Sequence, residues 1–131
     1  MNKSGLLHDD LSMVIAMLGH KDTIVISDAG LPIPDTTLRI DLAVRCGTPP
    51  FLDVLEVVLQ QLAVESAIVT KETAKESPDM DKRLREKLGQ LPVETIKHDE
   101  LKERSKTAKA VVRTGECTPY SNVILVAGVT F

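Results

Sequence analysis

The segment Thr23-Ile-Val-Ile-Ser27, followed by Asp28-Ala-Gly-Leu-Pro-Ile-Pro-Asp35, decides the fold class of this chain. Its first five residues are apolar or β-branched, which predicts a buried strand. Pro32 and Pro34 then exclude a regular helix or a central strand, because proline lacks the backbone N–H that both require. We therefore expect Asp28 to lie in a polar loop at the carboxyl end of a buried strand.

Helical and strand patterns alternate along most of the chain around this segment. Apolar residues at helical spacing predict a first helix, capped by Asp9 and Asp10 and stopped by Gly19. Further helices are expected over residues 51–63, 79–88 and 99–106, and further strands over residues 37–44, 66–70, 93–97, 109–113 and 122–127. The alternation predicts a single α/β domain over residues 1–131 with a mostly parallel sheet. Two strands close together at the C-terminus make a mixed sheet the expectation.

Composition and charge exclude several classes of function. The 131 residues carry a formal net charge of −3, and interspersed acidic and basic residues argue against nucleic-acid binding. No apolar run approaches the ~20 residues that cross a bilayer, and the N-terminus has no secretory pattern. We therefore expect a soluble cytoplasmic protein without a membrane partner. Aromatic residues make up only 2% of the chain, so the core should be aliphatic.

The two cysteines and the most polar segments give weaker expectations. Cys46 and Cys117 are far apart and form no CxxC pair, so we expect two free thiols rather than a disulfide or a zinc site. The polar segment 73–79 is expected to be a mobile surface loop, and the charged helix after it should mostly face water. Arg113 and Glu116 are expected to form a structural ion pair.

Three histidines are candidates for proton transfer, because imidazole titrates near neutral pH. His20 follows the glycine that ends the first helix, so it is either a catalytic group or a histidine stabilised by the helix dipole. His8 is expected to be a solvated surface residue. His98 lies at a strand-to-helix junction, where both an end cap and a site residue are possible.

Asp28, Tyr120 and Asn122 are candidates for binding hydroxyl groups. Asp28 could accept hydrogen bonds from a sugar or orient a histidine, and it could equally cap the following turn. Tyr120 is the only tyrosine, and Asn122 would point to the same face of an extended chain. A turn asparagine beside a partly buried tyrosine is the alternative. Because GxGxxG, P-loop, HExxH and GxSxG motifs are all missing, proton transfer or simple binding are the functions left.

Three ordered segments resemble one known family. Gly19-His20, the Asp28–Asp35 segment and Arg113-Thr-Gly-Glu-Cys-Thr-Pro-Tyr-Ser-Asn122 are similar to motifs of the ribose pyranase and fucose mutarotase family. The resemblance spans nearly the whole chain. Gly30-Leu31-Pro32 and Thr118-Pro119-Tyr120 resemble the ribose branch. The resemblance implies an isomerase that interconverts the β-pyranose and β-furanose forms of D-ribose.

The resemblance also implies a three-layer α/β/α fold that uses neither metal nor organic cofactor. It further implies a homodecamer of two pentameric rings, with sugar sites near subunit boundaries. By position, His20 matches the catalytic proton donor. The positions that match substrate contacts are Asp28, His98, Tyr120, Ser121 and Asn122.

Two alternatives belong to other functional classes. One is a non-catalytic sugar-binding or regulatory subunit of a ribose uptake system. The other is a phosphotransfer protein that uses His20 or His98, and it ranks last because neither histidine has a glycine-rich loop or an arginine clamp nearby.

Overall fold

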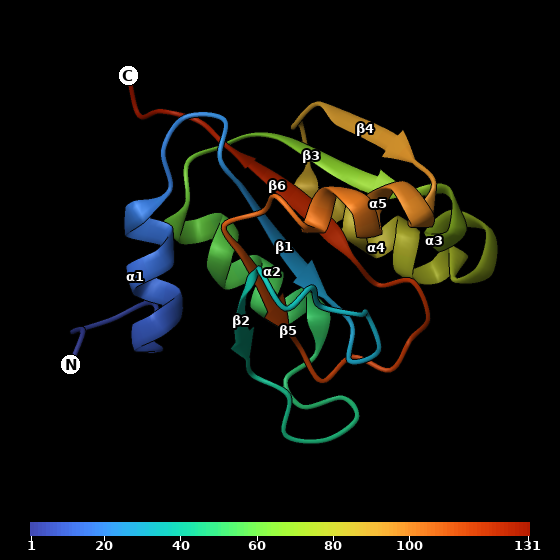
Figure 1. Ribbon diagram of the computed structural model, residues 1–131, viewed down its shortest axis with the longest axis horizontal. Helices are drawn as coiled ribbons and strands as arrows, with labels where there is room; N and C mark the ends of the chain where they lie inside the picture. The colour runs from blue at the N-terminus through green and yellow to red at the C-terminus, as the bar shows by residue number, and fades with distance from the viewer.

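The computed structural model describes residues 1–131 and contains a six-stranded sheet and five helices (Figure 1). The helices are α1 (Asp9–Met17), α2 (Phe51–Gln61), α3 (Lys71–Glu76), α4 (Pro78–Leu88) and α5 (His98–Ser105). The strands are β1 (Thr23–Ser27), β2 (Leu38–Asp41), β3 (Val64–Thr70), β4 (Val93–Ile96), β5 (Ala110–Arg113) and β6 (Val123–Ala127). All six strands lie within a residue or two of the predicted positions, except that β2 is shorter than expected.

The strand order is β2-β5-β1-β6-β3-β4. β6 runs antiparallel to both of its neighbours, β1 and β3, whereas all other adjacent strands are parallel. The prediction of a mixed, mostly parallel sheet is therefore confirmed. Five strands end, and β6 begins, at what we call the C-terminal end of the sheet. The opposite side is its N-terminal end.

Helices cover both faces of the sheet, which confirms the three-layer fold. Alternation along β1 sends Ile24 and Ile26 to one face and Val25 to the other. The first face packs against α1, α2 and α4, and the second against α5 and the loop after β1. Figure 1 shows α5 in front of the sheet and α2 behind it. The core is almost entirely aliphatic, with Phe51 as its one large aromatic residue.

Two local expectations are wrong and one is confirmed. Segment 73–79 is not a mobile loop, because α3 occupies most of it and buries Thr73 fully. α4 mostly faces water, as expected, and only Met80, Leu84 and Leu88, which recur at helical spacing, are buried. The cap of α1 is His8, whose Nδ1 accepts the Leu11 N–H at 3.2 Å, rather than Asp9 or Asp10. An imidazole nitrogen can replace the usual carboxylate or hydroxyl cap because it offers the same kind of lone pair.

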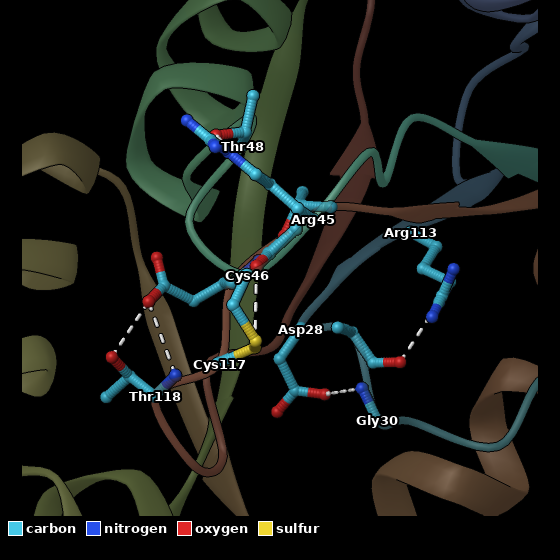
Figure 2. The surroundings of a disulfide bond; sticks show 12 residues. Asp28, Gly30, Arg45, Cys46, Thr48, Arg113, Cys117 and Thr118 are labelled. Carbon is cyan, nitrogen blue, oxygen red and sulfur yellow. Dashed lines mark hydrogen bonds between the residues drawn. A yellow bond between two sulfur atoms is a disulfide. The ribbon is translucent and has the colours of Figure 1, made fainter.

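Cys46 and Cys117 form a disulfide, so the expectation of two free thiols is also wrong. The two residues are 71 positions apart in sequence, yet their Cα atoms lie 5.5 Å apart. They meet because β2 and β5 are adjacent parallel strands, so the loops after them leave the sheet side by side. Gly47 and Gly115 also join these loops through a backbone hydrogen bond of 2.6 Å. Figure 2 shows the disulfide between the two loops, with Asp28 and Thr118 nearby.

None of the helices is both long and apolar enough to span a bilayer.

Candidate active site

A cavity of about 610 Å³ opens at the C-terminal end of the sheet. The loops after β1 and β5 form two of its walls, and α5 contributes a third. The lining residues are Asp28, Ala29, Gly30, Leu31, Pro32, His98, Lys102, Glu116, Cys117, Thr118, Pro119 and Tyr120. Small-molecule sites measure roughly 300–1,000 Å³ and gather at the carboxyl ends of strands in α/β folds. The cavity therefore has the size and the place of a ligand site.

Asp28 caps a turn and also lies at the cavity. Its Oδ1 caps the following turn by accepting the Gly30 N–H at 3.0 Å, and the residue also lines the cavity. Burial raises the pKa of Asp28 above its usual value. Hydrogen bonds from the backbone of Gly30, Ser121 and Leu31, and from the side chain of Asn122, oppose this rise without cancelling it. Asp28 is therefore a half-buried carboxyl group that is still able to face a ligand.

Ser121 and Asn122 are fully buried beneath the cavity. Asn122 Oδ1 accepts the Asp28 backbone N–H at 3.0 Å, and its Nδ2 faces Asp28 Oδ2 at 3.4 Å. The Ser121 hydroxyl donates to the carbonyl of Thr118 at 2.9 Å. Within one chain, these two side chains therefore support the cavity wall instead of lining it.

His98 and Tyr120 form one side of the cavity. Their rings meet edge to face, with centroids 4.9 Å apart and planes at 84°. The backbone N–H of His98 donates to Glu72 Oε2 at 2.6 Å, which fixes the start of α5. Nδ1 of His98 is buried and has no hydrogen-bond partner in the chain.

The expected shared face of Tyr120 and Asn122 is wrong. Tyr120 has φ 61°, and the Asn122 N–H donates to the Tyr120 carbonyl at 3.1 Å. This is a tight turn rather than an extended chain, so side chains two residues apart do not alternate as in a strand. Tyr120 lines the cavity, whereas Asn122 points into the core beside Asp28.

Glu116 is a cavity residue to which the sequence assigned the wrong partner. Its Oε1 accepts the Phe51 N–H at 3.1 Å, and its Oε2 accepts the Thr118 hydroxyl at 2.8 Å. Arg113 instead pairs with Asp41 at 3.1 Å and donates to the Ala29 carbonyl. One signal was present: Pro50 precedes α2 and has no capping side chain, so the helix needs a cap from elsewhere.

The second missed cavity residue is Lys102. It follows His98 by four residues on α5, so the two side chains lie on one face of that helix. The spacing could have indicated Lys102 once His98 was considered a site residue. Its Nζ lies 3.5 Å from Oδ1 of Asp99, whose side chain is largely exposed, whereas the Lys102 side chain is partly buried.

His20 lies at the N-terminal end of the sheet, away from the cavity of its own chain. Its Nε2 is 2.9 Å from Glu65 Oε2, and Lys21 also contacts this carboxylate. The Lys21 side chain, followed by that of His20, holds the pKa of Glu65 below its usual value. The whole of β1, roughly 13 Å long at ~3.3 Å per residue, separates His20 from Asp28. The side chain of His20 is 52% exposed, so it faces outward from its own subunit.

No group of three or more His, Cys, Asp or Glu side chains is arranged to hold a metal ion. The groups at the cavity include the Asp28 carboxyl, the His98 imidazole and the Tyr120 phenol, which can exchange hydrogen bonds and protons with hydroxyl groups.

The fold and the cavity define a small α/β protein with a polar ligand site at the C-terminal end of a mixed sheet. Residues 1–130 match the model of the RbsD / FucU transport protein family. The chain belongs to this family. Similar relatives include the D-ribose pyranase of Symbiobacterium thermophilum, which is 56% identical over the full length of both chains. That of Geobacillus thermodenitrificans is 47% identical over all of this chain and 99% of its own.

Solved structures show the same fold. Bacillus subtilis RbsD complexed with D-ribose superposes with a TM-score of 0.96, at 45% identity over the full length of both chains. The fucose mutarotase of Streptococcus pneumoniae in complex with L-fucose superposes with a TM-score of 0.75. That match covers 95% of this chain and 94% of the other at 23% identity, so it shows the fold alone.

Proposed function

We propose that this protein is an isomerase that interconverts the β-pyranose and β-furanose forms of D-ribose. The observation that carries the proposal is a cavity holding Asp28, His98 and Tyr120 in a chain 45% identical, over its full length, to a protein solved with D-ribose. The relatives named D-ribose pyranase support the same activity at 47–56% identity. We further propose that residues 1–131 act as one domain in the cytoplasm.

Sugar binding would use Asp28, His98 and Tyr120 of the cavity wall. The Asp28 carboxyl accepts hydrogen bonds from sugar hydroxyls, while the Tyr120 phenol and the His98 imidazole can donate or accept them. Ser121 and Asn122 would contribute from below, by fixing the loop and the carboxyl group that the sugar touches. Together these groups suit a small molecule with several hydroxyl groups.

The chemistry requires only proton transfer. To open the pyranose, the ring oxygen gains a proton, the anomeric hydroxyl loses one, and the bond between the ring oxygen and the anomeric carbon breaks. The hydroxyl on the fourth carbon then attacks the open-chain aldehyde and loses its proton, while the aldehyde oxygen gains one and becomes the anomeric hydroxyl of the furanose. The former ring oxygen keeps its proton as the hydroxyl on the fifth carbon. We assign the donated proton to His20, because a positioned histidine contributes typically 10²- to 10⁴-fold to such a step.

His20 would act on the cavity of a neighbouring subunit. One chain places the imidazole and the cavity at opposite ends of the sheet, and the His20 side chain is half exposed. An assembly that brings the N-terminal end of one sheet to the C-terminal end of another would complete the site. We propose the decamer of two pentameric rings as this assembly.

A second candidate follows from the same separation. Because the cavity of one chain lacks His20, a single chain could bind sugar without accelerating ring exchange. This would make the protein a sugar-binding or regulatory subunit of ribose uptake.

Proton NMR saturation transfer on D-ribose separates the two candidates. With the isomerase, irradiating a β-pyranose signal drains the β-furanose signal only when protein is present. His20→Ala should abolish this transfer while ribose still binds. Binding without any exchange in the wild type would instead favour the sugar-binding subunit, and exchange at the full rate in His20→Ala would remove His20 from the mechanism.

Mixed assemblies test whether two subunits share a site. His20→Ala and Tyr120→Phe chains carrying different affinity tags are produced in one cell, and assemblies holding both tags are purified. If His20 serves a neighbouring cavity, about a quarter of the sites in a random mixture are intact, and activity returns. If His20 served its own cavity, no site would be intact and the mixture would be as inactive as its parents.

A further inference from the structure

Two hydroxyl groups of the α3 region hold the loop that carries Tyr120. The Thr73 hydroxyl donates to the Tyr120 carbonyl at 2.7 Å, and the Ser77 hydroxyl donates to the Pro119 carbonyl at 2.7 Å. Thr73 is fully buried and Ser77 almost so. Neither side chain lines the cavity. Hydrogen bonds from buried hydroxyls to consecutive carbonyls fix the orientation of two successive peptide planes.

The single hydroxyl proton of Thr73 fixes the direction of a short relay of hydrogen bonds. Thr73 Oγ1 lies 2.9 Å from Thr70 Oγ1, and either atom alone could be the donor. A hydroxyl has one proton, and Thr73 uses its own on the Tyr120 carbonyl. Thr70 must therefore donate to Thr73, and its oxygen in turn accepts the Thr73 N–H at 3.4 Å. The relay runs from Thr70 through Thr73 to Tyr120, and such chains strengthen their members.

The residue at the end of this relay has an unusual backbone. Tyr120 has φ 61°, the left-handed region that a bulky aromatic residue rarely occupies. Such a conformation persists only where the surroundings over-determine it, and it gathers at functional sites. Here the Tyr120 carbonyl accepts both the Thr73 hydroxyl and the Asn122 N–H. The ring of Tyr120 is thereby directed against His98 at the cavity wall.

We propose that Thr73 and Ser77 are positioning residues for the sugar site. They touch no ligand. They hold residues 119–120 so that the Tyr120 ring stands against His98, and thereby set the affinity of the cavity for its sugar. The proposal rests on the proposed function for the identity of the ligand, D-ribose, but the placement of Tyr120 can be tested separately.

The test compares Thr73→Val, which loses the hydroxyl with little change in shape, with Thr73→Ser, which keeps it. Thr37→Val is the matched control, because Thr37 is also buried and donates to the carbonyls of Ser105 and Lys106, away from the cavity. Tyr120 is the only tyrosine and the chain has no tryptophan, so the sharp tyrosine band in near-ultraviolet circular dichroism, read above the broad signal of the disulfide, reports on this residue. Ribose affinity is measured by titration, and KM and kcat by saturation transfer.

Thr73→Val should weaken ribose affinity by about fivefold or more and raise KM more than it lowers kcat, with an altered tyrosine band. Thr73→Ser should stay within about twofold of the wild type, as should Thr37→Val despite its loss of stability. Wild-type affinity with an unchanged band in Thr73→Val would overturn the proposal, and so would an equal loss in Thr37→Val.

Ser77→Ala is the second variant, in case Thr73→Val does not fold. It removes only the bond to Pro119, and it should shift the tyrosine band and the affinity in the same direction. If Ser77→Ala changes neither the tyrosine band nor the ribose affinity, the proposal is contradicted. If the wild type neither binds nor exchanges ribose while the tyrosine band still changes in the variants, the positioning role holds and the proposed function fails.

Discussion

Asp28 and Asn122 hold one another through a reciprocal pair of contacts across neighbouring antiparallel strands. The Asp28 N–H donates to Asn122 Oδ1 at 3.0 Å, and Asn122 Nδ2 faces Asp28 Oδ2 at 3.4 Å. The residues are 94 positions apart and meet because β6 begins beside the end of β1. The amide thus fixes a carboxyl group that faces the cavity on one side and the core on the other.

Asn122→Asp should destabilise the protein by about 2–4 kcal/mol at pH 7, because it buries a second carboxylate against Asp28. The loss should shrink toward pH 5, where the two groups can share one proton. Urea unfolding at both pH values measures the effect. Asn122→Ala is the control, since it removes the contact without adding charge. Because the Asn122 amide favours the ionised form of Asp28, this loss should also be larger at pH 7 than at pH 5, but it should depend on pH less than the loss in Asn122→Asp. An Asn122→Asp variant as stable as the wild type at pH 7 would contradict this account.

Asp28→Asn should change how stability depends on pH. Burial raises the pKa of Asp28 in the folded protein above its unfolded value of about 3.9, so the folded state holds the proton more tightly. Tighter proton binding stabilises the folded state. This stabilisation is fully present at pH values below the unfolded pKa, and it is lost as pH rises through the folded pKa. The difference in free energy of unfolding should therefore shift in favour of Asp28→Asn between pH 4 and pH 7. A shift in favour of the wild type would mean that the ionised form is the stabilised one.

The disulfide should stabilise the protein measurably. It closes a loop across a sequence separation of 71 residues, for which the chain-entropy model gives roughly 4 kcal/mol as an upper value. Backbone bonds between the same loops remain after reduction, so we expect a loss of about 2–4 kcal/mol rather than unfolding. Urea unfolding with and without dithiothreitol measures it. The Cys46→Ser, Cys117→Ser double variant should be as stable as the reduced wild type, and dithiothreitol should not change its stability. Two titratable thiols in wild-type protein purified without reductant would show that the disulfide is absent.

Glu116→Ala should cost about 1 kcal/mol of stability, because it uncaps α2 and frees Thr118 at the same time. Glu116→Gln retains an oxygen for the Phe51 N–H and should lose less. Ribose affinity should fall in the same order, since Glu116 joins the cavity loop to the helix. Glu103→Ala provides the control, because its only partner is the exposed Lys106 and its effect should stay within ~0.5 kcal/mol. Equal effects at the two glutamates would argue against a bracing role for Glu116.

The sequence predicted the elements of the fold well, because β-branched runs and helical spacing report burial locally. The family resemblance grouped Asp28, His98 and Tyr120 as substrate contacts, and the structure places all three at one cavity. The sequence missed two contacts that depend on the order of the strands. Because β5 lies between β2 and β1, Arg113 pairs with Asp41 and Cys117 lies beside Cys46.

Periodicity carries no information on which strands become neighbours, so these partners had no signal. The prediction for Tyr120 and Asn122 was wrong for a different reason. The expectation that Tyr120 and Asn122 share a face assumed extended backbone, and a left-handed tyrosine breaks that assumption. α3 was missed because five of its six residues are polar and only Thr73 is fully buried.

The position of β6 also governs when this protein can fold. β6 is the only link between the group β2-β5-β1 and the pair β3-β4, so without it the sheet is two separate pieces. In a chain that lacks β6, the edges of β1 and β3 that pair with it are uncovered. Exposed strand edges of this kind favour association between chains. Folding must therefore wait for Val123–Ala127, and nascent chains halted before this strand should be the form most prone to aggregate.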